Sequence, residues 1–225
     1  MLDTLKDTYS LEKTPAFVMT GCSAGGKGVA GNCDRVGDYL TSLNPEINYK
    51  CVADASGWIP LPLKNTNNCN NDQRERDSTA LWNREINEEC QSAMQEAGKD
   101  PIADCSFETQ YAHFHKHPIM FIGSMQDTIF IERHTCVDYN RIAPWEISLW
   151  LHHMQRTTES YFHDNPEVSI FLSPCPGHCT LGGFNQEKVD GMRPIDAMKL
   201  FVFDNVPVHV IASLQHSYPQ CPNAW

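Results

Sequence analysis

Short apolar runs, each followed by a loop of small or reactive residues, recur along the chain. They are AFVMT at 16–20, YKCVA at 49–53, PIMFIG at 118–123 and VSIFL at 168–172. Each run is rich in β-branched or aromatic residues and is largely apolar on both faces, which is typical of a buried parallel strand. The pattern therefore predicts four parallel strands at these positions.

Helical periodicity fills the intervals between these runs. One helical stretch follows the first run, and another begins at Ser78, a suitable N-cap, and stops before Gly98. A third helical stretch has a proline in its first turn, where proline is favoured. The predicted helices cover residues 27–40, 78–97, 144–162 and 194–203, and a short helical face is expected within residues 1–15.

Strands that alternate with helices indicate an α/β fold, with a mostly parallel sheet flanked by helices. The chain has 225 residues, of which 41% are hydrophobic and 20% are charged, a composition typical of a globular protein. We expect a single domain over residues 1–225. An irregular, Asn-rich surface insertion is expected over residues 60–77, pinned by Cys69.

The charge balance narrows the classes of partner. The chain has 28 Asp and Glu residues against 17 Lys and Arg residues, a formal net charge of −11. It lacks the positive surface that a phosphate backbone requires, so we expect no nucleic-acid partner. The same charge would repel a polyanionic substrate unless the binding cleft is locally basic. Because no apolar run is long enough for a transmembrane helix, no membrane span is predicted.

Ten cysteines are scattered along the chain, with no CxxC pair and no zinc-ribbon spacing. Dispersed cysteines in this number indicate an oxidising compartment and several disulfides, although a reduced cytosolic protein is the alternative. The first residues are polar and do not form a signal peptide. We expect a protein secreted to the extracellular space or the cell wall, with its signal peptide upstream of residue 1.

The first apolar run leads into a glycine-rich turn that carries a serine. The stretch GCSAGG at 21–26 fits G-x-S-x-G between a predicted strand and a predicted helix. A serine on such a turn projects above the sheet, and the amide of the next residue, Ala24, can donate to a developing oxyanion. Ser23 is therefore a candidate nucleophile. The glycines of the elbow are Gly21, Gly25 and Gly26. The alternative is a glycine-rich turn without catalysis, whereas the spacing of a P-loop is absent.

Two later runs end in residues that would complete a hydrolytic triad. An α/β-hydrolase presents its triad in the chain order Ser, acid, His, and after Ser23 come Asp127 and then His178. The carboxyl ends of parallel strands meet at one edge, where ligands bind. Taken singly, these two residues also fit a solvated carboxylate and a surface histidine. Asp54 is the rival acid, but it comes early in the chain, so we expect it in the site wall with Trp58.

A histidine cluster offers metal binding as an alternative chemistry. His113, His115 and His117 alternate before the third run, and on an extended segment they would share one face, as zinc ligands can. No fourth ligand is evident nearby, so a solvated lead-in to the strand is the favoured interpretation. We predict neither a metal nor any other cofactor.

These motifs resemble those of the pectin acetylesterase/Notum family, whose members have an α/β-hydrolase-like fold. The similar segments are GCSAGG at 21–26, CVADASGW at 51–58, SMQDTIFI at 124–131, CPGHC at 175–179, RPIDAMKLFVFDN at 193–205 and YPQCPNAW at 218–225. The resemblance implies that Ser23 is the nucleophile and His178 the general base, oriented by Asp127. It also implies that the Ala24 amide donates to the oxyanion and that catalysis passes through an acyl-enzyme.

The resemblance further implies a substrate class. We expect a serine carboxylesterase that removes acetyl or other acyl groups from a cell-wall or extracellular polysaccharide such as pectin. A Notum-like deacylase of a lipidated protein is the enzyme alternative, and a catalytically inactive secreted binding module is the alternative from another class. In the family, strands and a glycine-rich segment with further oxyanion donors precede the elbow. Because the elbow begins at residue 21, we expect the chain to lack those N-terminal strands.

Overall fold

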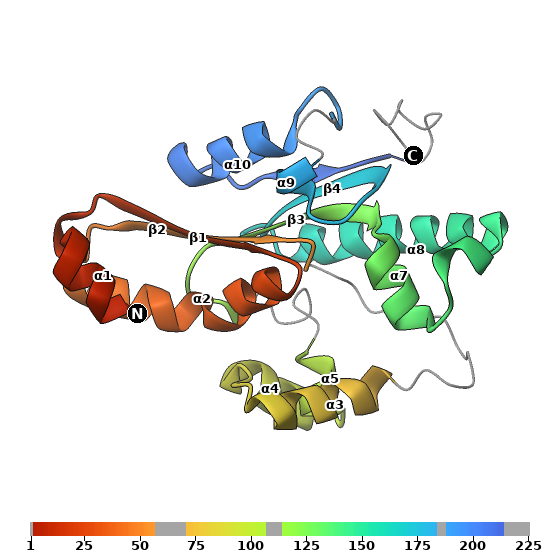
Figure 1. Cartoon of the computed structure of the whole chain (residues 1–225), viewed down its shortest axis with the longest axis horizontal. Coiled ribbons are helices and arrows are strands. Elements are labelled where there is room, and N and C mark those ends of the chain that lie inside the picture. Colours follow the sequence, from red (N-terminus) through yellow and green to blue (C-terminus); the bar gives the residue numbers. More distant parts are fainter. Residues whose placement is uncertain (1, 57–70, 107–113, 184–187, 214–225) are drawn as a thin grey trace.

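A five-stranded parallel sheet forms the centre of the computed structural model, which describes residues 2–56, 71–106, 114–183 and 188–213 (Figure 1). The strands lie side by side in chain order, and each neighbouring pair is parallel. The strands are β1 Ala16–Cys22, β2 Asn48–Asp54, β3 Ile119–Gln126, β4 Ser169–Pro176 and β5 His209–Ile211. The predicted α/β class is therefore confirmed.

The four predicted runs coincide with β1 to β4, and each strand continues beyond its run toward the carboxyl edge of the sheet. Strand β3 is buried along its whole length, and β4 is buried up to its last residue. Strand β1 is an edge strand of this sheet and is mostly half-buried. Strand β5 was not predicted, because its three residues show no apolar run.

Helices connect the strands in the described part of the chain. The α-helices are α1 Leu2–Tyr9, α2 Ala24–Leu43, α3 Asn71–Trp82, α4 Glu88–Glu96, α5 Pro101–Asp104, α7 Thr128–Thr135, α8 Pro144–Asp164, α9 Thr180–Gly183 and α10 Pro194–Phe203. Two 3-10 helices, η1 Leu11–Lys13 and η3 Tyr139–Arg141, are also present. The helices predicted at 27–40, 144–162 and 194–203 are confirmed as α2, α8 and α10.

The single helix predicted over residues 78–97 is wrong. Ser78 lies inside α3 rather than at its start, and α3 ends where Asn83 adopts a left-handed backbone with φ 46°. Helix α4 then begins after Asn87, whose side chain accepts a hydrogen bond from the Cys90 amide at 2.9 Å. Asparagine tolerates left-handed backbone and caps helices well, so these two positions break a continuous periodicity into two helices.

The irregular insertion predicted over residues 60–77 is also wrong in its second half. Residues 71–77 belong to α3 and are helical. Residues 57–70, which include Trp58 and Cys69, lie outside the described residues.

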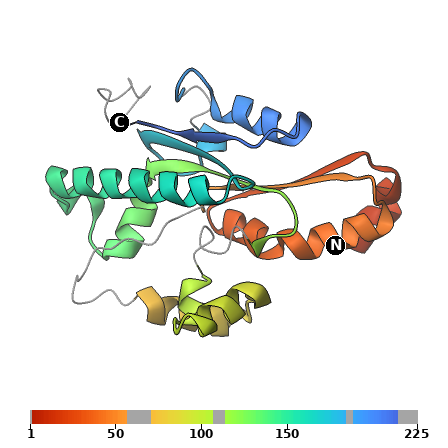
Figure 2. The same cartoon turned by 180° about the vertical axis from the view of Figure 1, so that it is seen from behind.

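Two helices cover opposite faces of the sheet. On β2, the hydroxyl of Tyr49 donates to the carbonyl of Cys33 on α2, whereas the ammonium of Lys50 lies over the ring of Phe201 on α10. Successive side chains of a strand point to opposite faces, so α2 and α10 must lie on opposite sides. The view from behind shows the same arrangement (Figure 2).

Disulfides tie distant segments together, as the cysteine count predicts. Three pairs are defined within the described residues: Cys22–Cys179, Cys33–Cys51 and Cys90–Cys105. The second joins α2 to β2, and the third joins α4 to the end of α5. The first joins the last residue of β1 to the loop after β4, at the carboxyl edge of the sheet.

Candidate active site

The turn between β1 and α2 has the geometry of a nucleophile elbow. Strand β1 ends at Cys22 and α2 begins at Ala24, so Ser23 alone forms the corner, with φ 58° and ψ −121°. A positive φ is costly for a non-glycine residue and persists only where its surroundings hold it. One such restraint is visible, because the Ser23 amide donates to the Asp54 carbonyl at 2.9 Å.

Steric contacts explain why glycine is required at two of the three predicted elbow positions. A Cβ on Gly21 would lie 2.5 Å from the carbonyl oxygen of Gly25, and one on Gly26 would lie 2.5 Å from that of Asp54. Both contacts are with backbone, so a side chain at either position would push the turn open. Gly25 itself faces open space.

Asp127 and His178 lie together at the same edge of the sheet. The Nδ1 of His178 donates to Oδ2 of Asp127 at 2.7 Å, and the amide of Phe130 donates to Oδ1 at 3.0 Å. Because a carboxylate only accepts, Nδ1 carries the proton of the neutral imidazole and Nε2 is the basic nitrogen. Burial raises the pKa of Asp127 above its ordinary value, while the hydrogen bond from His178 acts in the opposite direction.

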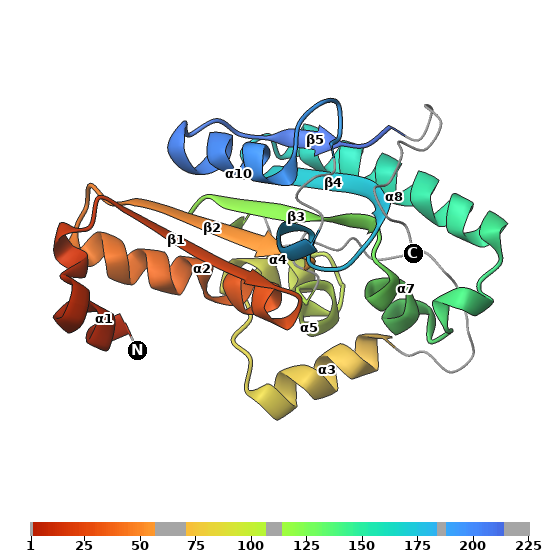
Figure 3. The same ribbon diagram turned by 45° about the horizontal axis from the view of Figure 1, so that its top comes forward.

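His178 is also close to the elbow. A nitrogen of its ring lies within 4.8 Å of the sulfurs of Cys22 and Cys179, which are bonded to each other. Cys22 immediately precedes Ser23, and Cys179 immediately follows His178. The structure thus brings the elbow and the Asp127–His178 pair to the edge of the sheet where β1, β3 and β4 end. Figure 3 shows that these three strands run in the same direction toward that edge.

Asp54 is buried behind the loop that carries His178 rather than lining an open surface. Only 1% of the residue is exposed, and its carboxylate accepts hydrogen bonds from the amides of Thr180 and Leu181 at 3.0 and 2.9 Å. Burial raises its pKa, although the two amides oppose that shift. Asp54 therefore contacts both the elbow, through its carbonyl, and the base loop, through its side chain. Trp58, its expected companion, lies outside the described residues.

A basic cleft begins beside the elbow and follows one face of α2. Its volume is about 660 Å³, and Ala24, the first residue of α2, is among the residues that line it. Among the described residues that line it, the cations are Lys27, Arg35, Arg84 and Arg133, against one acidic side chain, Glu85. Trp82, which is 76% exposed, also lines it. The cleft is thus positive although the chain is strongly acidic.

A buried carboxylate organises these cations. Glu75 of α3 is 5% exposed, and its oxygens lie 3.7 Å from Lys27, 3.7 Å from Arg84 and 3.3 Å from Arg133. Among the described residues, this single carboxylate therefore pairs with three cations of the cleft. The same contacts attach α3 to α2 and α7.

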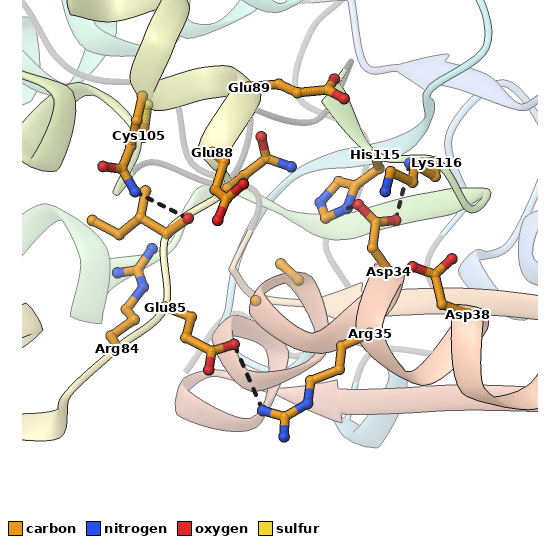
Figure 4. Close-up of a pocket in the computed structure, with 15 residues that line it drawn as sticks. Asp34, Arg35, Asp38, Arg84, Glu85, Glu88, Glu89, Cys105, His115 and Lys116 are labelled. Atoms are coloured by element: carbon orange, nitrogen blue, oxygen red, sulfur yellow. Dashed lines mark hydrogen bonds and ion pairs between the residues drawn. The ribbon is translucent and has the colours of Figure 1, made fainter.

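A second, acidic cleft of about 720 Å³ continues along α2 (Figure 4). The two clefts share Arg35, Arg84 and Glu85, beyond which the charge reverses. The carboxylates that line only the second cleft are Asp34, Asp38, Glu88 and Glu89. The groove beside α2 therefore has a basic half next to the elbow and an acidic half away from it.

The histidines before β3 pair with carboxylates of α2, so the solvated lead-in predicted for them is wrong. His115 lies 3.4 Å from Asp34, with 4% of its side chain exposed, and His117 lies 3.0 Å from Asp38. His113 lies outside the described residues. The donor atoms of Cys33, Asp34 and His115 approach within 4.8 Å of one another, but the sulfur of Cys33 is bonded to Cys51. Among the described residues of this group, the disulfide leaves Asp34 and His115 as ligands, fewer than a zinc site needs.

The parallel sheet and the serine elbow between β1 and α2 place the chain in the α/β-hydrolase-like class. A sequence model of the pectinacetylesterase family matches residues 1–223, and the chain belongs to this family. The resemblance seen in the sequence is thereby confirmed.

Solved structures agree with this fold. Two crystal forms of the Wnt deacylase Notum from Drosophila match with TM-scores of 0.75 and 0.74 at 21% sequence identity. Each alignment covers 97% of this chain but only 62% and 61% of the Notum chains, so the chain spans less than two thirds of that protein. A search of curated protein sequences gave no significant match. No helix in the described ranges combines the length and the apolar character needed to cross a membrane.

Sequence reasoning missed two features of the site. It placed a cysteine beside Ser23 and another beside His178, but it did not pair them. It also did not find the support beneath the base loop, where Ser124 donates to the Cys175 carbonyl and Gln126 to the Pro174 carbonyl. The sequence signal for the disulfide was the position of the two cysteines beside Ser23 and His178. The hydrogen bonds of Ser124 and Gln126 had no sequence signal.

Proposed function

We propose that this chain is a serine carboxylesterase that removes acetyl groups from a cell-wall or extracellular polysaccharide such as pectin. The observation that carries the proposal is the 2.7 Å hydrogen bond between His178 and Asp127 beside the strained elbow of Ser23. An oriented imidazole next to a half-buried serine at a strand-to-helix corner is the arrangement that acyl transfer requires. Membership of the pectinacetylesterase family supports the same reaction class.

The residues take complementary roles in this mechanism. The Oγ of Ser23 attacks the ester carbonyl while Nε2 of His178 accepts its proton, and Asp127 stabilises the imidazolium that forms. The first amides of a helix have no acceptor within the helix, so the Ala24 amide can donate to the oxyanion. His178 then returns the proton to the leaving sugar oxygen. Water, activated by the same histidine, hydrolyses the acyl-enzyme and releases acetate.

The basic cleft supports an acidic sugar chain as the substrate. Uronate carboxylates would meet Lys27 and Arg35 of α2, and Arg84 from the segment between α3 and α4, in the cleft that Ala24 also lines. Trp82 offers an exposed ring of the kind that stacks on sugars. This local charge answers the difficulty that a chain of net charge −11 would otherwise repel a polyanion.

The proposal also includes the compartment and the catalytic unit. Buried disulfides such as Cys33–Cys51 persist in oxidising surroundings, which supports secretion to the extracellular space or the cell wall. The elbow, the acid and the base all follow strands of one sheet, which supports a single catalytic domain over residues 1–225.

A fluorophosphonate probe tests the proposal. We expect covalent labelling of Ser23 in the wild type and none in Ser23→Ala, because only an activated serine reacts. A panel of p-nitrophenyl esters should then show that acetate is preferred over longer acyl chains. Preference for long chains would instead favour a Notum-like deacylase. An unlabelled wild type would reject the esterase and leave a secreted binding module.

A further inference from the structure

We propose that the Cys22–Cys179 disulfide and Asp54 together form a positioning device that holds the imidazole of His178 at the elbow of Ser23. The inference rests on the proposed esterase function and adds residues outside the Ser, His and Asp to it. Two independent links, one covalent and one hydrogen-bonded, join the nucleophile turn to the base loop.

The disulfide is directly adjacent in sequence to both the candidate nucleophile and the candidate base. Cys22 and Cys179 are 157 residues apart in the chain, yet their Cα atoms lie 5.5 Å apart. One is bonded through a single peptide to Ser23, and the other through a single peptide to His178. Any displacement of the base loop away from the elbow must therefore deform the disulfide or the two peptides beside it.

The backbone on both sides of this link is held in an unfavourable conformation. Ser23 has φ 58° and Cys179 has φ 61°, both in the left-handed region that non-glycine residues avoid. Such conformations persist where the surroundings restrain them, and they gather at functional sites. One of the two strained residues is the candidate nucleophile itself and the other directly follows the candidate base, and the disulfide restrains both.

Asp54 makes the second link. Its carbonyl accepts from the Ser23 amide at 2.9 Å, and its carboxylate accepts from the amides of Thr180 and Leu181. The same residue thus holds the nucleophile from one side and the residues that follow the disulfide from the other. Because the side chain is fully buried, these hydrogen bonds do not compete with solvent.

The base loop needs such support because the helix directly after it is short. Helix α9, which comes directly after Cys179, has only four residues, and 22% of the His178 side chain is exposed. A displacement of about 1 Å in a catalytic group can cost about 10²-fold in rate. In this proposal the device acts on the alignment of Nε2 with the serine hydroxyl.

The test compares two double variants in kcat and KM for p-nitrophenyl acetate. We expect Cys22→Ala/Cys179→Ala to lower kcat about 10²-fold with KM changed less than about threefold. The matched control, Cys90→Ala/Cys105→Ala, removes another buried disulfide and should keep kcat within about twofold. Asp54→Asn, which retains the size of the side chain, should lower kcat about tenfold. Thermal melts establish that each variant is folded at the assay temperature.

A double-mutant cycle separates positioning from simple stabilisation. If the device acts through the imidazole, removing the disulfide from His178→Ala should cause no further loss of the residual rate. A loss of the same factor in both backgrounds would overturn the proposal, as would a disulfide variant with wild-type kcat. If the variant without the Cys22–Cys179 disulfide does not fold, Asp54→Asn is compared in the wild-type and His178→Ala backgrounds to make the same distinction. A wild type that neither labels nor turns over rejects the esterase itself, a result distinct from these.

Discussion

Burial sets the charge of individual side chains near the site, and His134 shows the effect most strongly. This residue of α7 lies with its ring 4.0 Å from that of Phe130. Burial, together with the nearby cations Lys27 and Arg133, lowers its pKa from 6.5 to about 3. The imidazole therefore stays neutral in the folded protein at pH values where the unfolded chain carries the charge.

This difference makes the stability of the fold sensitive to acid. The unfolded chain takes up the proton on His134 below about pH 6.5, whereas the native state takes it up only near pH 3. The contribution of this residue to the free energy of unfolding is therefore complete above pH 6.5 and is lost as the pH falls toward 3. Each pH unit in that window costs about 1.4 kcal/mol. Between pH 7 and pH 4.5, the unfolding free energy of His134→Phe should therefore fall by about 2.5 kcal/mol less than that of the wild type, measured by urea denaturation.

The control for this prediction is His163→Phe, because 87% of that side chain is exposed. Its curve against pH should run parallel to that of the wild type. If His134→Phe also ran parallel, the histidine would not be held neutral by the fold.

Local chemistry made the elbow predictable from the sequence at this scale. The turn needs glycine at Gly21 and Gly26 because a Cβ there would strike backbone, and a motif search detects that requirement directly. The pairing of His115 with Asp34 left no such signal, because it depends on α2 packing beside a distant segment.

At the scale of elements, α2 connects the site to the groove. Its first residue, Ala24, carries the amide that we propose as the oxyanion donor. The same face continues through Lys27 to Arg35, a span of about 16 Å at the rise of an α-helix. A chain of acidic sugars bound with its ester at Ser23 would lie along this face. The acidic half of the groove beyond Arg35 would limit how far it extends.

Reversing one charge on this face tests the role of the groove. Arg35 is 74% exposed in its side chain and pairs with Glu85 at 3.6 Å. We expect Arg35→Glu to raise the KM for acetylated pectin about tenfold, equivalent to about 1.4 kcal/mol of binding, while leaving turnover of p-nitrophenyl acetate unchanged. The increase should shrink at high salt.

Arg156→Glu is the matched control, because this exposed arginine on α8 makes the same change in net charge but lines neither cleft. An equal rise in KM for both variants would mean that overall charge, and not the groove, governs binding.

Helices and strands were predictable where one sequence pattern determined the local structure. Strands β1 to β4 follow from apolar runs, and α8 from its length and opening proline. The break between α3 and α4 was missed because two asparagines outweighed a periodicity that continued through them. Strand β5 is too short for any period to identify it, and its place is set by pairing with β4.

At the scale of the whole molecule, the site exists because the sheet is parallel and ordered. Strands β1, β3 and β4 end at the same edge, so a serine, an aspartate and a histidine far apart in the chain become neighbours. Chain order made this convergence predictable. The disulfide that closes it was not, because ten cysteines allow many pairings and only the fold brings residues 22 and 179 together.

The turnover of Ser23→Ala on p-nitrophenyl acetate tests the central claim most directly. Removing the hydroxyl leaves the sheet, the disulfides and the Asp127–His178 hydrogen bond in place, so the variant should fold with a wild-type melting temperature. We predict that its kcat falls by about four to six orders of magnitude. A folded variant that keeps turnover near the wild-type value would contradict the account, because no other group on the elbow carries a nucleophilic hydroxyl.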